Sequence, residues 1–329
     1  MYFLESDSLD PHYNLALEQY VFDVLAVKRD FFMLWRNDNA IIVGRHQNTA
    51  AEINARYVKE HGIRVVRRLS GGGAVYHDRG NINFTFIAAA QSGPAFDFGT
   101  FCRPVVKALA SFGIQAAISG RNDMTIGGAK FSGNAQYRKH NRVMHHGTIL
   151  YDSDLSVVGN ALNVSKDKIA SKGLSSVRSR VTNVREHMPV DIPVERFMNA
   201  LREAMFHEYG LTACTLTEQD RKAVTALQHS RYETWEWNYG TSPAYTIRKE
   251  RRIESFGTLE IRMDVDKGII TRLALYGDYF GNGDSAELCA SLVGTRLARE
   301  ELKKALHGVA LDEYFHNLTL ESFLDLLLE

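Results

Sequence analysis

The stretch Arg64-Val65-Val66-Arg67-Arg68-Leu69-Ser70-Gly71-Gly72-Gly73-Ala74-Val75-Tyr76-His77-Asp78 joins two short apolar segments through three consecutive glycines. The β-branched residues before the glycines and the apolar residues after them predict a strand, a loop and a second strand. Glycine permits positive φ and a close approach of backbone to ligand, and the loop N–H groups, with Arg67 and Arg68, offer positive charge to an anion. The stretch therefore fits a phosphate-type binding loop, and it also fits a plain hairpin turn.

The glycine loop does not have the spacing of the two common nucleotide-binding motifs. In this stretch no G-x-G-x-x-G opens a helix, and no G-x-x-x-x-G-K-[ST] occurs. Rossmann and P-loop folds are therefore not indicated. If the loop binds a nucleotide, a different nucleotide-binding fold is needed.

The composition is that of a globular protein with room for two domains. Hydrophobic residues make up 45% and charged residues 24% of 329 positions. Lys plus Arg equals Asp plus Glu, 39 each, so the charge balance favours neither a nucleic-acid nor a membrane partner, and we expect neither.

The cysteines and the N-terminus bear on where the protein works. Cys102, Cys214 and Cys289 are widely spaced and lack a C-x-x-C motif, which argues against a disulfide framework or a zinc site. No signal-peptide core and no run of about 18 apolar residues occurs, so we expect neither secretion nor membrane insertion. A reducing, cytoplasmic setting fits these features.

Apolar alternation predicts an α+β fold with a largely antiparallel sheet. Asp10-Pro11 is a typical helix start, with an N-cap and a proline in the first turn. Residues 31–36 and 40–45 read as a β-hairpin, and residues 81–88 alternate as a half-buried strand.

A second, smaller α+β domain is predicted near the C-terminus. Residues 259–265 and 268–276 alternate as strands, and helical patterns follow them. The basic run at residues 248–252 is a candidate linker. We therefore expect one domain at residues 1–247 and a second at residues 253–329.

A second informative cluster surrounds Lys130, which lies between Gly127-Gly128 and Ser132-Gly133. With little bulk beside it, its ammonium group is free to reach a phosphate, although an exposed lysine on an edge strand shows the same pattern. His145 and His146 are adjacent on a predicted strand and point to opposite faces, so only one of them faces a pocket. The basic segment at residues 172–180 fits either a surface loop or a flap over a polyphosphate.

Taken together, these blocks resemble the lipoate-protein ligases, and the resemblance covers essentially the whole chain. The order and number of the matching blocks carry the resemblance. They are Asn14 to Glu18, Trp35-Arg36, Gly44-Arg45-His46-Gln47-Asn48, Arg67-Arg68-x-x-Gly71-Gly72-Gly73, His77-Asp78-x-Gly80-Asn81, Lys130-x-Ser132-Gly133, His145-His146-Gly147-Thr148, Ser176-Val177-Arg178-Ser179-Arg180-Val181 and Trp235-x-Trp237-Asn238-x-Gly240.

The resemblance implies a fold and a reaction. The fold is a biotin/lipoate ligase-type domain, related to class II aminoacyl-tRNA synthetases, with a mixed, largely antiparallel sheet and a small α+β C-terminal domain. The reaction has two steps: lipoate and Mg-ATP give lipoyl-AMP and pyrophosphate, and a lysine of an acceptor protein then takes the lipoyl group. The implied acceptors are lipoyl domains of 2-oxoacid dehydrogenase complexes or the glycine-cleavage carrier protein.

The resemblance also implies roles for individual residues. Lys130 contacts the carboxylate and α-phosphate region and is the catalytic candidate, because an anionic carboxylate must approach an anionic phosphate. Asp123 is a candidate for orienting Mg²⁺ or the acceptor amine. The residues expected to bind lipoate are Leu17, Arg68, Ser70, Gly71, Gly72, Gly73, His77 and His146. Those expected to bind ATP or the adenylate are Arg68, Gly73, Val75, Tyr76, His77, Asp78, Asn81, Asn122, Lys130, Ser176 and Arg178.

Three other functions share parts of this pattern. A lipoyl or octanoyl transferase takes its acyl group from a ready-made donor, and some members of that wider superfamily use a catalytic cysteine. Cys102 lies in a predicted helix and not in a loop that matches the position of that catalytic cysteine. A biotin ligase shares the fold and mechanism, and a non-catalytic protein that binds lipoyl-adenylate shares the pocket.

Overall fold

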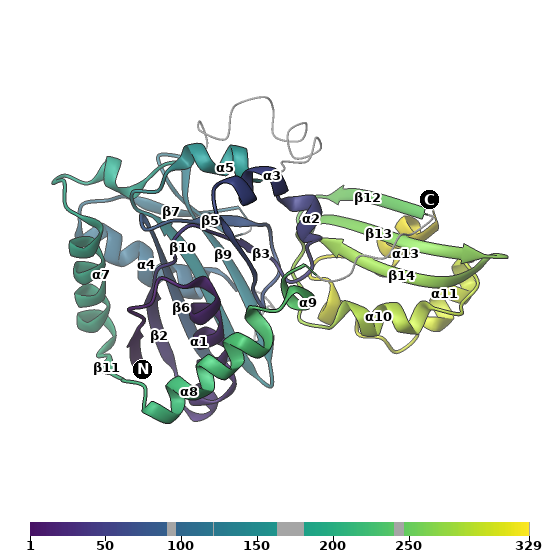
Figure 1. Ribbon diagram of the computed structural model, residues 1–329. Helices are drawn as coiled ribbons and strands as arrows, with labels where there is room; N and C mark the ends of the chain where they lie inside the picture. The colour runs from purple at the N-terminus through teal and green to yellow at the C-terminus, as the bar shows by residue number, and fades with distance from the viewer. Residues whose placement is uncertain (91–96, 121, 163–180, 240–246, 329) are drawn as a thin grey trace.

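The computed structural model describes residues 1–90, 97–120, 122–162, 181–239 and 247–328. Figure 1 shows a larger part, coloured purple to green, beside a smaller green to yellow part that ends at the C-terminus. Each part is built on its own β-structure. Among the described helices none has the length and apolar character needed to cross a membrane.

An eight-stranded mixed sheet forms the centre of the larger part, in the order β11-β1-β2-β6-β10-β9-β8-β7. Strand β1 pairs in parallel with β2 and β11, and the other neighbours pair antiparallel, which confirms the predicted mixed, largely antiparallel sheet. The strands are β1 (Tyr2–Glu5), β2 (Phe31–Trp35), β6 (Asn81–Ala89), β7 (Ala116–Ser119), β8 (Asp123–Ile126), β9 (Ala129–Lys139), β10 (Arg142–Leu150) and β11 (Thr212–Ala213).

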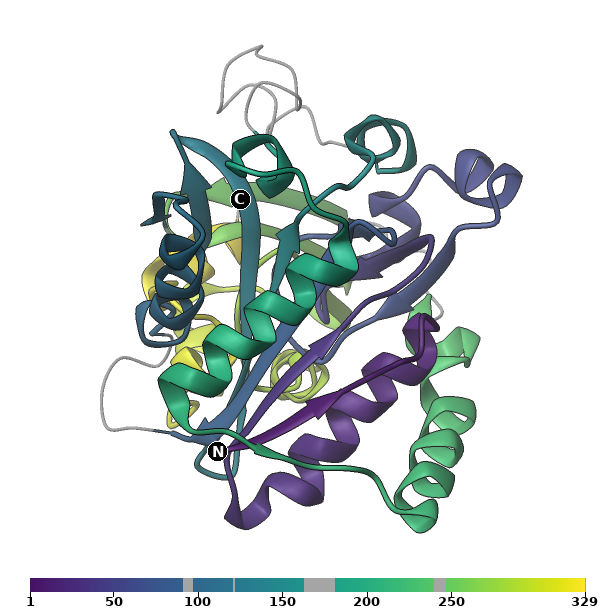
Figure 2. The ribbon, with the colours of Figure 1, turned by 90° about the vertical axis from the view of Figure 1, so that its left-hand side faces the viewer.

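Helices cover both faces of this sheet, and each face has its own apolar core (Figure 2). Helices α4 (Gly99–Ser111) and α7 (Val194–Tyr209) pack on one face, and α1 (Pro11–Asp23) and α8 (Glu218–Leu227) pack on the other. The Asp10 side chain caps α1 by accepting from the His12 N–H, as the sequence predicts. The shorter elements are η1 (Leu25–Lys28), α2 (Thr49–Glu52), α3 (Ala55–Glu60), α5 (Leu155–Ala161), η3 (Val184–His187), η4 (Gln228–Tyr232) and α9 (Trp235–Asn238).

A separate three-stranded sheet carries the glycine loop, in the order β4-β3-β5. The strands are β3 (Ala40–Val43), β4 (Arg64–Arg67) and β5 (Val75–His77). Because β3 lies between β4 and β5, the loop crosses over one end of β3, and the plain hairpin turn is excluded. The hairpin predicted for residues 31–36 and 40–45 is also wrong, since β2 belongs to the large sheet and β3 to the small one.

The smaller part packs four helices against an antiparallel sheet of order β12-β13-β14, around its own apolar core. Residues 248–252 lie inside β12 and pair with Thr258 to Arg262 of β13, so they are not a linker. The charged run fits the position of β12 at the edge of this sheet, where none of its residues is fully buried. The elements are β12 (Ile247–Ile253), β13 (Gly257–Asp266), β14 (Ile269–Gly277), α10 (Ser285–Leu292), α11 (Arg299–Ala305), α12 (Leu311–Tyr314) and α13 (Leu320–Leu328).

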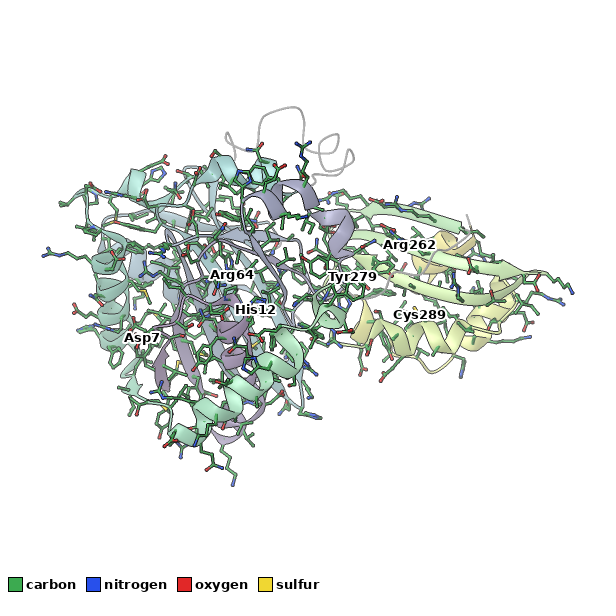
Figure 3. All side chains as sticks on the ribbon, viewed as in Figure 1. Asp7, His12, Arg64, Arg262, Tyr279 and Cys289 are labelled. Carbon is green, nitrogen blue, oxygen red and sulfur yellow. The ribbon has the colours of Figure 1, made fainter. Side chains whose placement is uncertain are left out.

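The two parts meet at the glycine loop, where Figure 3 labels Tyr279. The Gly72 N–H donates to the Tyr279 carbonyl oxygen at 3.1 Å, and the Gly277 N–H donates to the His46 carbonyl oxygen at 2.6 Å. The buried Phe280 ring lies 5.4 Å from the ring of Phe98 in the core of the larger part. Residues of the smaller part therefore pack directly behind the loop.

Close backbone packing leaves no room for a side chain at Gly44 or Gly71. A Cβ atom at Gly44 would overlap the carbonyl oxygen of Gly72, whereas one at Gly73 would meet no atom of the described residues within 4 Å. We expect Gly44→Ala to lower the free energy of unfolding by roughly 1–3 kcal/mol, because the backbone must shift to relieve the overlap. Gly73→Ala is the matched control in the same denaturation measurement. Equal stability of the two variants would contradict this account.

Candidate active site

The candidate active site is a pocket between the large sheet and the small sheet. It brings together many of the residues singled out from the sequence, from segments far apart in the chain. The lining residues are Leu15, Trp35, Ile42, Arg68, Gly72, Gly73, Ala74, Val75, His77, Asn83, Asn122, Lys130, Gly133, Asn134, Ala135, His146, Gly147 and Thr148.

A second cavity adjoins this pocket and shares Val75, Lys130 and Thr148 with it. Its further walls are mostly apolar and come from β5, β10 and α5. Lys130 thus stands where two cavities meet. Ala74 and Gly133 also line both cavities, and the remaining residues of the second cavity are Tyr76, Leu150, Leu155, Val158, Leu162 and Val181.

Lys130 lies on β9 next to an irregularity in the pairing of β8 with β9. Its Nζ is 2.7 Å from Oδ1 of Asp123, and its side chain is 38% exposed. A Cβ atom at Gly133 would come within 3.1 Å of this Nζ, so the glycine leaves the space that the ammonium group occupies. The small residues beside Lys130 thus give it access to both cavities.

The glycine loop is shaped by Arg68, whose guanidinium is buried. It donates to the carbonyl oxygens of Ile42, Gly71 and Gly73 at 2.7–3.0 Å and to Ser70 Oγ at 3.1 Å. Burial lowers the pKa of Arg68 to about 10, so it stays charged at neutral pH. Arg68 therefore holds the loop closed around itself, and most of its donors are occupied by backbone.

Arg67 does not face the pocket, although the sequence analysis offers it to an anion. Strand alternation turns it to the opposite side from Arg68. There it donates to the carbonyl oxygens of Gly44, Arg45 and Gln47 at 2.7–3.0 Å and to Thr49 Oγ1 at 2.6 Å. Its role is to fix the segment after β3.

His146 connects the glycine loop to helix α1 through a buried chain of hydrogen bonds. Its Nε2 is 2.6 Å from Ser70 Oγ, and its Nδ1 is 2.8 Å from Oε1 of Glu18. The carboxylate of Glu18 accepts from Nδ1–H, and in the tautomer without a proton on Nε2 that nitrogen accepts from the Ser70 hydroxyl. Ser70 is therefore buried behind the loop. Of the adjacent histidines His145 and His146, His146 is the one that lines the pocket.

His77 and Asn83 present buried polar atoms at the pocket. Within the described part of the chain, His77 Nε2 and Asn83 Nδ2 have no hydrogen-bond partner. Burial, followed by the charge of Arg68, lowers the pKa of His77 to about 3, so its ring is neutral at neutral pH. Asn83 was missed from the sequence, although it shares the alternating face of β6 with Asn81, its hydrogen-bond donor at 3.0 Å.

Several residues expected at the site lie elsewhere. Leu17 faces a different cavity, beside Tyr13 and Cys214, because residues two apart on a helix lie about 200° apart, and Leu15 takes its place. Asp78 caps backbone N–H groups of Gly80 and Asp154. Asn81 lies behind Asn83, and Gly71 packs on Tyr279. Ser176 and Arg178 fall outside the described residues.

Cys102 is not placed for nucleophilic catalysis. It is fully buried in α4, 3.9 Å from Nε2 of His145 on the face of the sheet opposite His146. Burial raises the pKa of its thiol to about 12, so no thiolate forms at neutral pH. Cys102 thus offers no activated nucleophile, and among the described residues that line both cavities the charged one is Lys130. Such a site fits an enzyme that acts on anionic substrates.

Comparison with known proteins agrees with this class. Residues 10–206 match the family described as Lipoyl protein ligase A/B catalytic domain, and residues 242–327 match Bacterial lipoate protein ligase C-terminus. The chain is 41% identical to lipoate-protein ligase LplJ of Bacillus subtilis over 99% of this chain and 100% of that protein. The chain therefore belongs to the lipoate-protein ligase family, as the resemblance predicts, and it is a ligase.

Solved structures support the same fold assignment. P. falciparum LipL1 in complex with lipoate is 25% identical, with a TM-score of 0.79 and coverage of 98% of this chain and 97% of that one. A lipoate-protein ligase A bound with ATP is 25% identical, with a TM-score of 0.61, over 73% of this chain and 97% of that one. A bipartite lipoate protein ligase of Thermoplasma acidophilum is 28% identical, with a TM-score of 0.63, over 75% of this chain and 98% of that one.

The buried environment of Cys102 leads to a prediction. We expect Cys102→Ala to ligate lipoate at the wild-type rate, since the thiol reaches neither cavity, and to lose only about 1 kcal/mol of stability from a small packing defect. The rate of lipoate ligation and the melting temperature, measured on the same preparation, check both parts. If Cys102→Ala folds normally but no longer ligates lipoate, the result would support a mechanism through a thioester on Cys102.

Proposed function

We propose that this protein activates lipoate with Mg-ATP to lipoyl-AMP and then transfers the lipoyl group to a lysine of an acceptor protein. The observation that carries the proposal is the position of Lys130 where the two cavities meet. One cavity suits the acyl tail of lipoate, with Leu15, Trp35 and Ile42 in its wall. The other, largely apolar cavity suits the adenine end of the nucleotide.

In the first step, a carboxylate oxygen of lipoate bonds to the α-phosphorus of ATP, and the bond from that phosphorus to the leaving pyrophosphate breaks. Lys130 supplies positive charge where the two anions approach each other. The ammonium group pairs with Asp123 at 2.7 Å. A phosphate oxygen entering the site competes with Asp123 for the same ammonium, which has three donors and a flexible stem.

In the second step, the acceptor lysine amine attacks the acyl carbon of lipoyl-AMP. The amide bond forms, the bond to AMP breaks, and the amine releases a proton. Lys130 stabilises the departing phosphate in this step as well, because AMP leaves as an anion. We propose lipoyl domains of 2-oxoacid dehydrogenase complexes or the glycine-cleavage carrier as acceptors. The T. acidophilum ligase, described with its E2 lipoyl domain, supports this acceptor class.

Magnesium enters this proposal with the nucleotide, as part of the substrate. Among the described residues no group of three His, Cys, Asp or Glu is placed to hold a metal ion. Asp123, with its side chain 33% exposed beside Asn122 of the pocket wall, offers one carboxylate. One carboxylate suits Mg²⁺, which keeps waters and phosphate oxygens as its other ligands.

The first test removes the central lysine. We expect Lys130→Ala to lower the rate of lipoyl-AMP and pyrophosphate formation from lipoate and Mg-ATP by about 10²–10³-fold, because a preorganised charge is lost. The assay uses no acceptor, so it measures activation alone. If wild-type protein forms no adenylate yet transfers the lipoyl group from supplied lipoyl-AMP, it is a transferase. If it binds lipoyl-AMP and does neither, it is a binding protein.

The second test addresses Asp123. We expect Asp123→Ala to weaken the dependence of lipoyl-AMP formation on Mg²⁺ concentration and to slow activation, while transfer from supplied lipoyl-AMP continues at the wild-type rate. The two steps are measured separately over a magnesium titration, with Asp97→Ala, a carboxylate outside both cavities, as the control. Normal activation by Asp123→Ala would exclude Asp123 as a metal-orienting residue.

A further inference from the structure

His77 has one partnered and one unpartnered ring nitrogen. Nδ1 is 3.1 Å from Nδ2 of Asn37, and Nε2 has no partner in the part of the chain that the structure describes. The ring lines the pocket and the residue is only 3% exposed. An unpartnered polar atom at this depth is costly unless something binds it.

The orientation of Asn37 is fixed by a neighbouring amide. Nδ2 of Asn14 lies 2.8 Å from the backbone carbonyl oxygens of Ser8 and Arg36 and 3.0 Å from Oδ1 of Asn37, so its two N–H groups are shared among three oxygen acceptors. Only an amide nitrogen donates to carbonyls, so the end of Asn14 that faces Asn37 is its nitrogen. The atom of Asn37 that accepts from it is therefore the oxygen, and its nitrogen faces His77.

The proton on His77 follows from this orientation. An amide nitrogen donates and does not accept, so Nδ1 of His77 must be the unprotonated nitrogen. A neutral imidazole carries one N–H, which is then on Nε2. The low pKa of His77 agrees with a neutral ring, since its burial beside Arg68 and His146 disfavours a second positive charge.

We propose that Asn37 is a positioning residue that fixes His77 as an Nε2–H donor, and that this donor binds an acceptor oxygen of the carboxylate or acyl phosphate formed in the pocket. The proposal rests on the acyl-adenylate function proposed above. It assigns a shared purpose to Asn14, from the first helix, and to Asn37, after β2, neither of which lines the pocket. A neutral donor binds such an oxygen without exchanging a proton with it, which separates its role from that of Lys130.

The tautomer is tested without any substrate. Histidine-labelled wild-type protein is examined by ¹⁵N NMR, with the His77 signals identified by their loss in His77→Gln. We expect the proton on Nε2 in wild type and on Nδ1 in Asn37→Asp, because a carboxylate accepts from Nδ1–H. A proton on Nδ1 in wild type would overturn the proposal whether or not the protein forms lipoyl-AMP.

The role in binding is tested by lipoyl-AMP formation. We expect His77→Phe and Asn37→Asp to lower kcat/KM for lipoate by about 10- to 100-fold, by analogy with the loss of a preorganised donor. His77→Gln, which keeps an N–H at the end of the side chain, should recover most of that loss. Equal activity of His77→Phe and wild type, or no recovery by His77→Gln, would overturn the proposal.

A matched control separates this role from stability. Gln136 is an equally buried amide that lies outside both cavities and contacts His145. We expect Gln136→Glu to lower the melting temperature, as Asn37→Asp does, while the Nε2 proton of His77 and kcat/KM for lipoate stay unchanged. If wild type forms no lipoyl-AMP, the proposed function fails, and the NMR result still decides the tautomer.

Discussion

Two buried guanidinium groups hold the backbone that forms the pocket. Arg67 and Arg68 are adjacent in β4 and point to opposite sides of it. A glycine-rich segment has few side chains to satisfy its carbonyl oxygens, and an arginine offers five donors in a fixed fork. Burying a cation is costly without partners, and here carbonyl oxygens surround each one. The loop after β3 and the glycine loop are therefore held in shape by the protein's own hydrogen bonds.

Under the proposed function, this arrangement gives the basic residues of the motif different roles. Arg68 is less a ligand for the substrate than a support for the loop, since carbonyl oxygens and Ser70 occupy its donors. The charge proposed to meet the reacting anions belongs to Lys130, which pairs with one carboxylate, that of Asp123, and lines both cavities. In this proposal the loop support, Arg68, and the reacting cation, Lys130, are different residues, so the loop need not reorganise when the lysine changes partners.

Local patterns in the sequence predicted local structure well and tertiary placement less well. The strand, glycine loop and strand around Gly71 to Gly73 are present, and so is the small-residue setting of Lys130. Periodicity does not say which sheet a strand joins, so the pairing of residues 31–36 with 40–45 was mistaken. A choice between Leu15 and Leu17, or between Asn81 and Asn83, depends on which face of an element meets the pocket. The basic run at residues 248–252 resembles a linker in composition, yet its pairing with β13 makes it a strand.

The contact between Gly72 and Tyr279 joins the glycine loop to the smaller part, so it matters whether the two parts belong to one polypeptide or to two. The small part supplies the packing behind the glycine loop, so a catalytic part on a separate polypeptide would have to recover this surface by association. Joining both parts in one chain turns that association into an intramolecular event with a high effective concentration. In a two-chain arrangement, the shape of the loop would instead depend on how much of the second subunit is present.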